Sequence, residues 1–169
     1  MEPLVDTVIE DPRWGDILPP LAEAAAQAVL ADLNLDPGRF AIVVMGCDDQ
    51  RIAALNTEFR GKPQPTNVLS WPSQDRAAAQ PGALPVLPDG QSDLAGELGD
   101  IAISFDTSAR EAAGQEKPFH DHVTHLIVHS VLHLLGYDHA DDADAALMED
   151  AEIRVLAKLG LPNPYSESR

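Results

Sequence analysis

The order of hydrophobic and polar positions predicts a chain of short strands and longer helices. We expect strands at residues 4–9, 40–45, 67–71 and 99–104. Each is a short run rich in β-branched and apolar residues, next to proline, glycine or acidic residues. The run at 40–45 is apolar throughout, which is typical of a central strand covered on both faces. The run at 67–71 precedes Pro72, and proline favours the edge of a sheet because it donates no backbone hydrogen bond.

Between and after these strands, apolar residues recur at helical spacing. We expect helices from residue 16 or 19 to 33, from a cap at Asp48 to Arg60, from 107 to 114, from 119 to 135, and from a cap at Asp141 or Asp142 through Leu159. The fourth of these helices is apolar on nearly all sides, which indicates a buried position.

This order of elements predicts the fold class. Two strand-helix-strand stretches followed by three helices are typical of an α+β fold. We therefore expect a small mixed sheet of four strands packed with about five helices, with the helix at 119–135 in the centre.

The length of 169 residues fits one domain that spans residues 1–169. Hydrophobic residues make up 44% of the chain and charged residues 23%, close to the average of globular proteins. Residues 73–94 carry Gln, Ala, Pro, Gly and Asp without helical or strand periodicity. We expect a long mobile insertion there, which could act as a lid.

Several features predict a cytoplasmic protein. The single cysteine, Cys47, cannot form an internal disulfide, and the residues after Met1 lack the basic and apolar parts of a secretory signal. The longest apolar stretches, at 41–47 and 126–135, fall short of the roughly 20 residues that cross a bilayer. We expect no membrane span.

The net charge of −17 argues against a broad basic surface for nucleic acid. An anionic substrate would need a local positive focus, which a metal ion with Arg60 and Lys62 can provide. The acidic residues between 138 and 150 are interpreted as a solvated helix face and cap, not as a second metal site.

Candidate metal ligands lie within residues 129–139, His-Ser-Val-Leu-His-Leu-Leu-Gly-Tyr-Asp-His. His129 and His133 are four residues apart, so they share a helix face. Gly136 is suited to end the helix in a left-handed conformation and to turn the chain back toward a third ligand, His139. Three neutral imidazoles suit one zinc ion and leave a fourth position open, as in catalytic zinc sites. The alternative is that these histidines only pack in the core or cap a turn.

The same segment overlaps the signature H-E-x-x-H-x-x-G-x-x-H of zinc proteases. Ser130 stands where those proteases carry the glutamate that acts as general base. A serine hydroxyl cannot take that proton at neutral pH, so peptide hydrolysis would need Asp138 or Glu149 as the base.

Four blocks of the sequence together resemble the YbeY-like bacterial family of zinc-dependent endoribonucleases. The blocks are Leu-Asn followed by Phe-Arg-Gly-Lys within residues 55–62, Pro-Thr-Asn-Val-Leu-Ser-Trp-Pro at 65–72, Leu-Gly-Asp-Ile at 98–101, and residues 125–139 with Met148, Glu149 and Glu152. The resemblance implies a cytoplasmic enzyme that cuts single-stranded RNA, matures the 3′ end of small-subunit rRNA and takes part in ribosome quality control. Ribosome-associated proteins are its implied partners.

The resemblance also implies roles for individual residues. His129, His133 and His139 match the zinc ligands of the family, and Arg60 matches its functionally important arginine. A guanidinium suits this role, because its planar fork fits phosphate and stabilises developing charge. By spacing alone, Arg60 is an ordinary exposed arginine at a helix end.

Some neighbouring positions have open interpretations. Ser130 replaces the usual glycine and is expected to narrow the metal cleft, whereas Trp71 replaces phenylalanine and keeps an aromatic ring. His125 shares the face of His129 and has either a supporting role or a packed core position. Four further residues either line an RNA groove or form a turn and an edge strand, namely Lys62, Thr66, Asn67 and Ser70. His120 and His122 are expected at the surface or as helix caps.

Two other functions stay open from the sequence. One is a zinc metallopeptidase-like hydrolase. The other is a nonenzymatic ribosome-assembly factor whose zinc only stabilises the fold.

Overall fold

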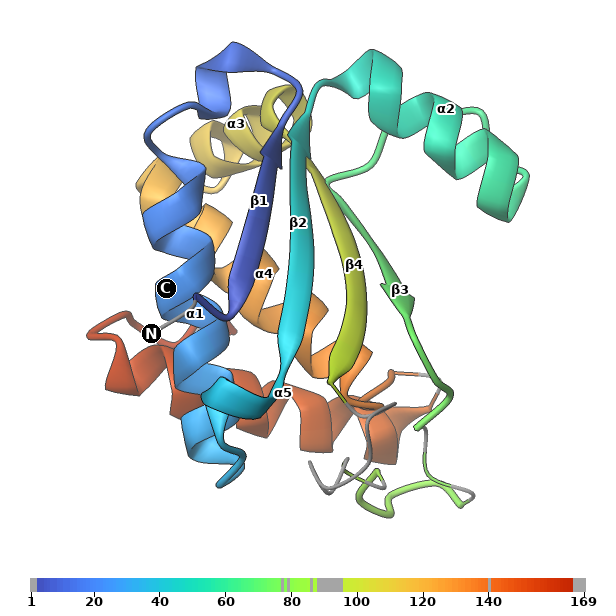
Figure 1. Cartoon of the computed structure of the whole chain (residues 1–169), viewed down its shortest axis with the longest axis vertical. Helices are drawn as coiled ribbons and strands as arrows, with labels where there is room; N and C mark the ends of the chain where they lie inside the picture. The colour runs from blue at the N-terminus through green and yellow to red at the C-terminus, as the bar shows by residue number, and fades with distance from the viewer. Residues whose placement is uncertain are drawn as a thin grey trace.

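The computed structural model describes residues 3–76, 78, 80–85, 87, 96–139 and 141–165. Within them lie a four-stranded sheet and five α-helices, which confirms the predicted α+β fold (Figure 1). The elements are β1 (Val5–Ile9), α1 (Leu18–Asp32), β2 (Ala41–Cys47), α2 (Asp49–Arg60), β3 (Val68–Pro72), β4 (Glu97–Ser104), α3 (Phe105–Gly114), α4 (Phe119–Leu134) and α5 (Asp142–Lys158), with short 3₁₀ helices at Pro12–Trp14 and Pro37–Arg39.

The described bounds differ from the predicted ones by no more than two residues at each end. Two predicted caps are present, since Asp48 accepts a hydrogen bond from the backbone of Arg51 and Asp141 accepts one from Asp144. Of the predicted insertion at 73–94, residues 77, 79, 86 and 88–94 lie outside the described residues. The described part of the insertion contains no helix or strand.

The sheet is mixed, as predicted, with the strand order β1-β2-β4-β3. β1, β2 and β4 are parallel, and β3 runs antiparallel to β4. β3 therefore occupies an edge, which confirms the position inferred from Pro72. One face of β3 borders the region where the candidate site lies.

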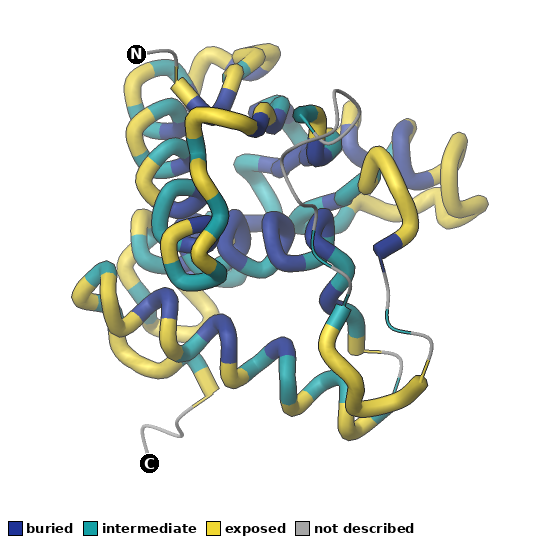
Figure 2. The backbone as a smooth tube through the Cα atoms, turned by 60° about the horizontal axis from the view of Figure 1, so that its bottom comes forward, coloured by how far each residue is buried: buried dark blue, intermediate teal, exposed yellow. Residues whose placement is uncertain are grey.

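The main core lies between one face of the sheet and the helices α1 and α4, and α5 packs against these two helices. α4 is central, because it packs against α1, α3 and α5 and also against β3 and β4. Figure 1 shows it passing behind the strands, and Figure 2 shows the buried residues gathered in the interior of the molecule. No helix of the described ranges is long and apolar enough to cross a membrane.

A smaller apolar cluster lies between α2 and the opposite face of the sheet. Its buried members are Cys47, Ile52, Leu55, Leu69 and Ala102. This packing holds α2 against β3 and β4, and it brings the last residue of the helix, Arg60, to the edge of the sheet.

Candidate metal centre

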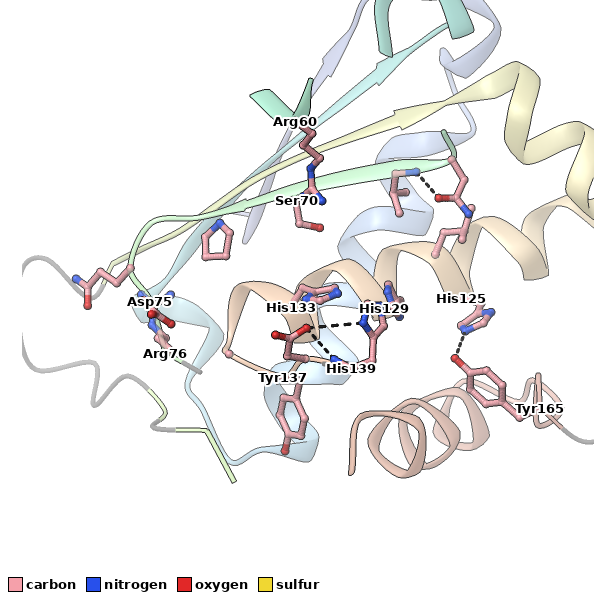
Figure 3. Close-up of a pocket in the computed structure, with 17 residues that line it drawn as sticks. Arg60, Ser70, Asp75, Arg76, His125, His129, His133, Tyr137, His139 and Tyr165 are labelled. Carbon is pink, nitrogen blue, oxygen red and sulfur yellow. Dashed lines mark hydrogen bonds and ion pairs between the residues drawn. The ribbon is translucent and has the colours of Figure 1, made fainter. Parts of the chain in front are cut away.

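A cleft of about 610 Å³ separates the edge strand β3 from α4 and the turn after it (Figure 3). Alternate residues of β3, namely Val68, Ser70 and Pro72, line one wall. They share one face of the strand because side chains alternate along it. His129 and His133 of α4 line the opposite wall together with His139.

The three histidines predicted from the sequence lie together in this cleft. One ring nitrogen from each lies within 4.8 Å of the others. The ring centroids are 4.9 Å apart for His129 and His133, 5.6 Å for His129 and His139, and 5.1 Å for His133 and His139. Among the described residues this is the one group of three or more His, Cys, Asp or Glu side chains with such spacing.

The turn that returns His139 to the cluster depends on Gly136. Gly136 has a φ of 104°, a region that residues with a side chain rarely adopt. A Cβ at this position would also clash with the backbone carbonyl of Arg76. Two features therefore require glycine at position 136. One is the left-handed turn that ends the helix, and the other is the close contact with the segment after β3.

The buried carboxylate of Glu152 on α5 supports the cluster from behind. Nδ1 of His129 lies 2.8 Å from Oε2 of Glu152, and Nε2 of His125 lies 2.6 Å from Oε1. The hydroxyl of Tyr165 donates to the same Oε1 at 2.6 Å. Because Nδ1 of His129 faces the carboxylate, Nε2 is the nitrogen that remains for a metal ion.

Protonation states suit metal binding at this site. Burial, followed by the proximity of His129 and His139, lowers the pKa of His133 to about 4. Burial raises the pKa of Glu152, but hydrogen bonds from His125 and His129 outweigh it and bring this pKa to about 2. At neutral pH the cluster thus offers a neutral imidazole at His133, backed by an ionised carboxylate. This donor set fits a divalent ion such as zinc.

Arg60 lines the same cleft from the end of α2. The helix ends at Arg60, as the sequence predicts, and Gly61 after it has a left-handed φ of 68°. Arg60 is exposed, and in Figure 3 its side chain lies above Ser70 on the β3 side of the histidines. A guanidinium and three imidazoles therefore face a common space.

Other candidates from the sequence have mixed outcomes. Asn67 and Ser70 line the cleft, whereas Lys62 and Thr66 do not. His125 takes the supporting position beside Glu152. Trp71 lies on the other face of β3, where its ring centroid is 5.5 Å from that of the exposed Phe59.

Two expectations were wrong. Ser130 does not narrow the cleft, because it is fully buried and outside the lining residues. His122 is neither a surface residue nor a helix cap, since it is 4% exposed and its Nε2 lies 2.9 Å from Oε1 of Glu111. A carboxylate from the neighbouring helix α3 accounts for this burial.

Sequence reasoning missed the roles of Glu152, Tyr165 and Arg76. Glu152 left one usable signal, because an acidic residue on the apolar stripe of a helix needs a buried partner. Tyr165 and Arg76 contact the site from segments far from it in sequence, and no local pattern marks them.

Comparison with known proteins gives one consistent family. The family described as Endoribonuclease YbeY matches residues 15–160. The Endoribonuclease YbeY of Paracoccus denitrificans is 62% identical over 164 residues, which cover 96% of this chain and 90% of the relative. That of Jannaschia sp. is 59% identical over 162 residues, covering 95% and 99%. That of Cereibacter sphaeroides is 59% identical over 167 residues, covering 98% and 100%.

A solved structure supports the fold. The solution structure of TM1509 from Thermotoga maritima aligns with a TM-score of 0.55 and 19% sequence identity, and the alignment covers 97% of each chain. At this identity the likeness concerns the fold alone.

Proposed function

The chain belongs to the YbeY family of endoribonucleases, and from this membership we propose that His129, His133, His139 and Arg60 form its active site. The family makes it a metal-dependent phosphodiester hydrolase with RNA as substrate. We propose that the metal is one zinc ion, and that the substrate is single-stranded RNA at the 3′ end of small-subunit rRNA. The proposal includes a role in ribosome quality control, ribosome-associated partners and a cytoplasmic location.

The observation that carries this proposal is the meeting of two kinds of group in one cleft. Three imidazole nitrogens lie within 4.8 Å of one another, and the same cleft is lined by Arg60. Imidazoles suit zinc, and a guanidinium suits phosphate. Cleavage of a phosphodiester builds negative charge that both can stabilise.

Zinc, when bound, supplies a Lewis acid and lowers the pKa of water near the phosphodiester toward about 7. The chain's residues then have separate tasks. Glu152 orients His129 and sets its tautomer through the 2.8 Å contact at Nδ1. Arg60 holds a phosphate through paired hydrogen bonds. The β3 wall confines the substrate to the space above α4.

Peptide hydrolysis is less well supported. Ser130 is buried away from the cleft, so no carboxylate occupies the position of the protease base. Asp138 lines the cleft, but its Oδ1 accepts a hydrogen bond of 2.7 Å from the backbone of His139. This contact restrains the carboxylate beside the turn.

The test combines metal analysis with cleavage. Protein purified without chelator should contain one zinc ion, cut a short single-stranded RNA, lose this activity with EDTA and regain it with zinc. An RNA duplex of the same sequence should be cut far more slowly, and casein should stay intact. Zinc-loaded protein that binds RNA without cutting it would favour the nonenzymatic assembly factor, and cleavage of casein would favour the peptidase.

A further inference from the structure

Arg76 places a buried positive charge in the wall of the metal cleft. The residue follows β3, lines the cleft and is 6% exposed. Nη1 donates to the carbonyl of Leu134 at 2.8 Å, and Nη2 donates to Oγ of Ser73 at 3.3 Å. Both acceptors are neutral. The guanidinium is thus held in place without being neutralised by its hydrogen-bond partners.

No carboxylate of the described ranges forms an ion pair with Arg76. Among the described residues, burial lowers the pKa of its guanidinium and no acidic group counteracts this effect. A buried charge without a counter-charge is strongly unfavourable. Arg13, Arg110 and Arg154 differ from Arg76 in both respects. Their side chains are largely exposed, and each forms an ion pair with a carboxylate.

The C-terminal end of α4 explains part of this arrangement. Leu134 is the last residue of α4, and its carbonyl carries the partial negative charge of a helix C-terminus. The partial negative charge of this carbonyl favours a cation at Arg76, and the hydrogen bond from Nη1 orients the guanidinium. A helix end supplies only about half of an elementary charge, however, so the guanidinium retains a net positive charge toward the cleft.

From this buried charge, which has no ion-pair partner among the described carboxylates, we propose that Arg76 binds a second phosphate of the RNA, apart from the phosphate held at Arg60. Figure 3 places Arg76 and Tyr165 at opposite ends of the cleft, with the three histidines between them. An RNA strand that crosses the metal centre thus meets a cation on its way along the β3 wall. The proposal rests on the proposed function, since it assigns a position to the same substrate.

A phosphate would give Arg76 the ion-pair partner that it does not have among the described carboxylates, although Asp75 and Asp138 also line the cleft. A guanidinium held by Leu134 and Ser73 is pre-positioned, so little side-chain entropy is lost on binding. In a chain of net charge −17, such local cations are needed to hold a polyanion. Arg76 acts in substrate binding and leaves the histidine cluster unchanged.

The first test measures how RNA affinity depends on salt in zinc-loaded protein. The probe is a short fluorescein-labelled 2′-O-methyl RNA followed by anisotropy at increasing KCl concentrations. The variants are Arg76→Gln, which keeps a donor for Leu134, Arg76→Lys, which keeps the charge, and Arg51→Gln as the control. Arg51 is an exposed arginine of α2 outside the cleft lining, and it pairs with Glu10.

The Arg76→Gln variant should keep its zinc and bind the RNA roughly tenfold more weakly at low salt. The slope of log Kd against log salt should fall by about 0.7, which is the value for one phosphate of a single strand. Arg76→Lys should retain most of the slope, and Arg51→Gln should match the wild type. An unchanged slope in zinc-loaded Arg76→Gln overturns the proposal.

The second test needs no variant and stands even if Arg76→Gln folds poorly. In the wild-type protein, single phosphates of the RNA are replaced in turn by neutral methylphosphonates. Two separate positions should each weaken binding, whereas a single sensitive position overturns the proposal. Cleavage of the unmodified RNA is followed in parallel. Wild-type protein that shows two sensitive positions and cuts no RNA would refute the proposed function and leave the second phosphate position intact.

Discussion

Nδ1 of His129 lies 2.8 Å from a carboxylate oxygen of Glu152, although the two residues belong to different helices and are 23 positions apart. The carboxylate is fully buried and ionised at neutral pH, so the imidazole nitrogen donates to it. This contact makes α5 part of the candidate metal centre. It also fixes which nitrogen of His129 is turned toward the cluster.

Glu152→Gln should weaken zinc binding by about 10- to 100-fold while the protein stays folded. The amide has nearly the same shape, but it is neutral and no longer a strong acceptor for His129 and His125. Zinc affinity is measured by competition with a chromophoric chelator. Glu149→Gln, one turn earlier on α5, is the matched control and should bind zinc as the wild type does. Equal affinities for all three proteins would exclude a supporting role for Glu152.

Arg60→Ala should retain zinc and fold but lose about two orders of magnitude in cleavage rate, since removal of a preorganised donor costs roughly 3 kcal/mol at the transition state. Arg60→Lys should recover only part of the rate, because an ammonium keeps the charge and loses the fork. The measurement is single-turnover cleavage of a short single-stranded RNA, with zinc determined on each sample. Loss of zinc in Arg60→Ala would make the role of Arg60 structural.

His133→Ala should bind zinc much more weakly and melt at a lower temperature than the wild type when zinc is present. A ligand that binds only the folded state stabilises it by about 2.7 kcal/mol at 100 times its Kd. Thermal unfolding is compared with zinc and with EDTA. The difference in melting temperature between the wild type and His133→Ala should be smaller in EDTA than in zinc. A gap of the same size in both conditions would mean that His133 contributes through packing alone.

Ser130→Ala should stabilise the protein by about 1 kcal/mol without changing zinc affinity. The Ser130 hydroxyl is fully buried and has no hydrogen-bond partner in the described ranges, so its removal eliminates a desolvation penalty. Urea unfolding measures the change. Thr124→Val is the contrasting control, because the Thr124 hydroxyl donates to the carbonyl of His120 at 2.8 Å and its loss should not stabilise. A destabilised Ser130→Ala would contradict the prediction.

Asp32 links α1 to α5 and should make part of the stability depend on pH. Its carboxylate is 5% exposed and accepts hydrogen bonds from Arg154 at 3.0 Å and Lys158 at 2.8 Å. Burial raises the pKa of Asp32, but these two cations outweigh it and lower the pKa below the ordinary value of 3.8.

Because the folded pKa is the lower one, the stabilisation is present above the unfolded pKa and is lost as the pH falls through the folded pKa. Asp32→Asn should therefore be less stable than the wild type by about 1 to 2 kcal/mol at neutral pH. The two proteins should converge as the pH falls through the folded pKa of Asp32, which lies below the ordinary value of 3.8. Unfolding by urea across this range, with EDTA in all samples, measures the difference. A constant difference at every pH would exclude the ion pair as its source.

The sequence was sufficient for the elements and for the histidine cluster because both depend on local geometry. His129 and His133 share a face through the helical repeat, and Gly136 marks the turn that returns His139. The apolar runs likewise place the strands. Pro72 correctly indicates an edge strand, because proline has no backbone N–H to donate and an edge strand needs hydrogen bonds on one side only.

The remaining parts of the site depend on contacts between distant segments. Glu152 reaches His129 from another helix, and Arg76 reaches Leu134 across 58 positions. The burial of His122 depends on Glu111 in α3, which the pattern of its own helix does not reveal. Pairings of this kind require the packing of α3, α4 and α5 to be known.

The candidate metal ligands lie within residues 129–139, whereas Arg60 and Ser70 come from the segment that forms the opposite wall. The two walls are thus encoded by separate stretches of the gene. Mutations in the segment from α2 through β3 can change how a substrate is held while leaving the histidine cluster as it is. Substrate preference can therefore change separately from the chemistry at the histidine cluster, and grafting residues 60–72 between relatives is a direct route to exchanging that preference.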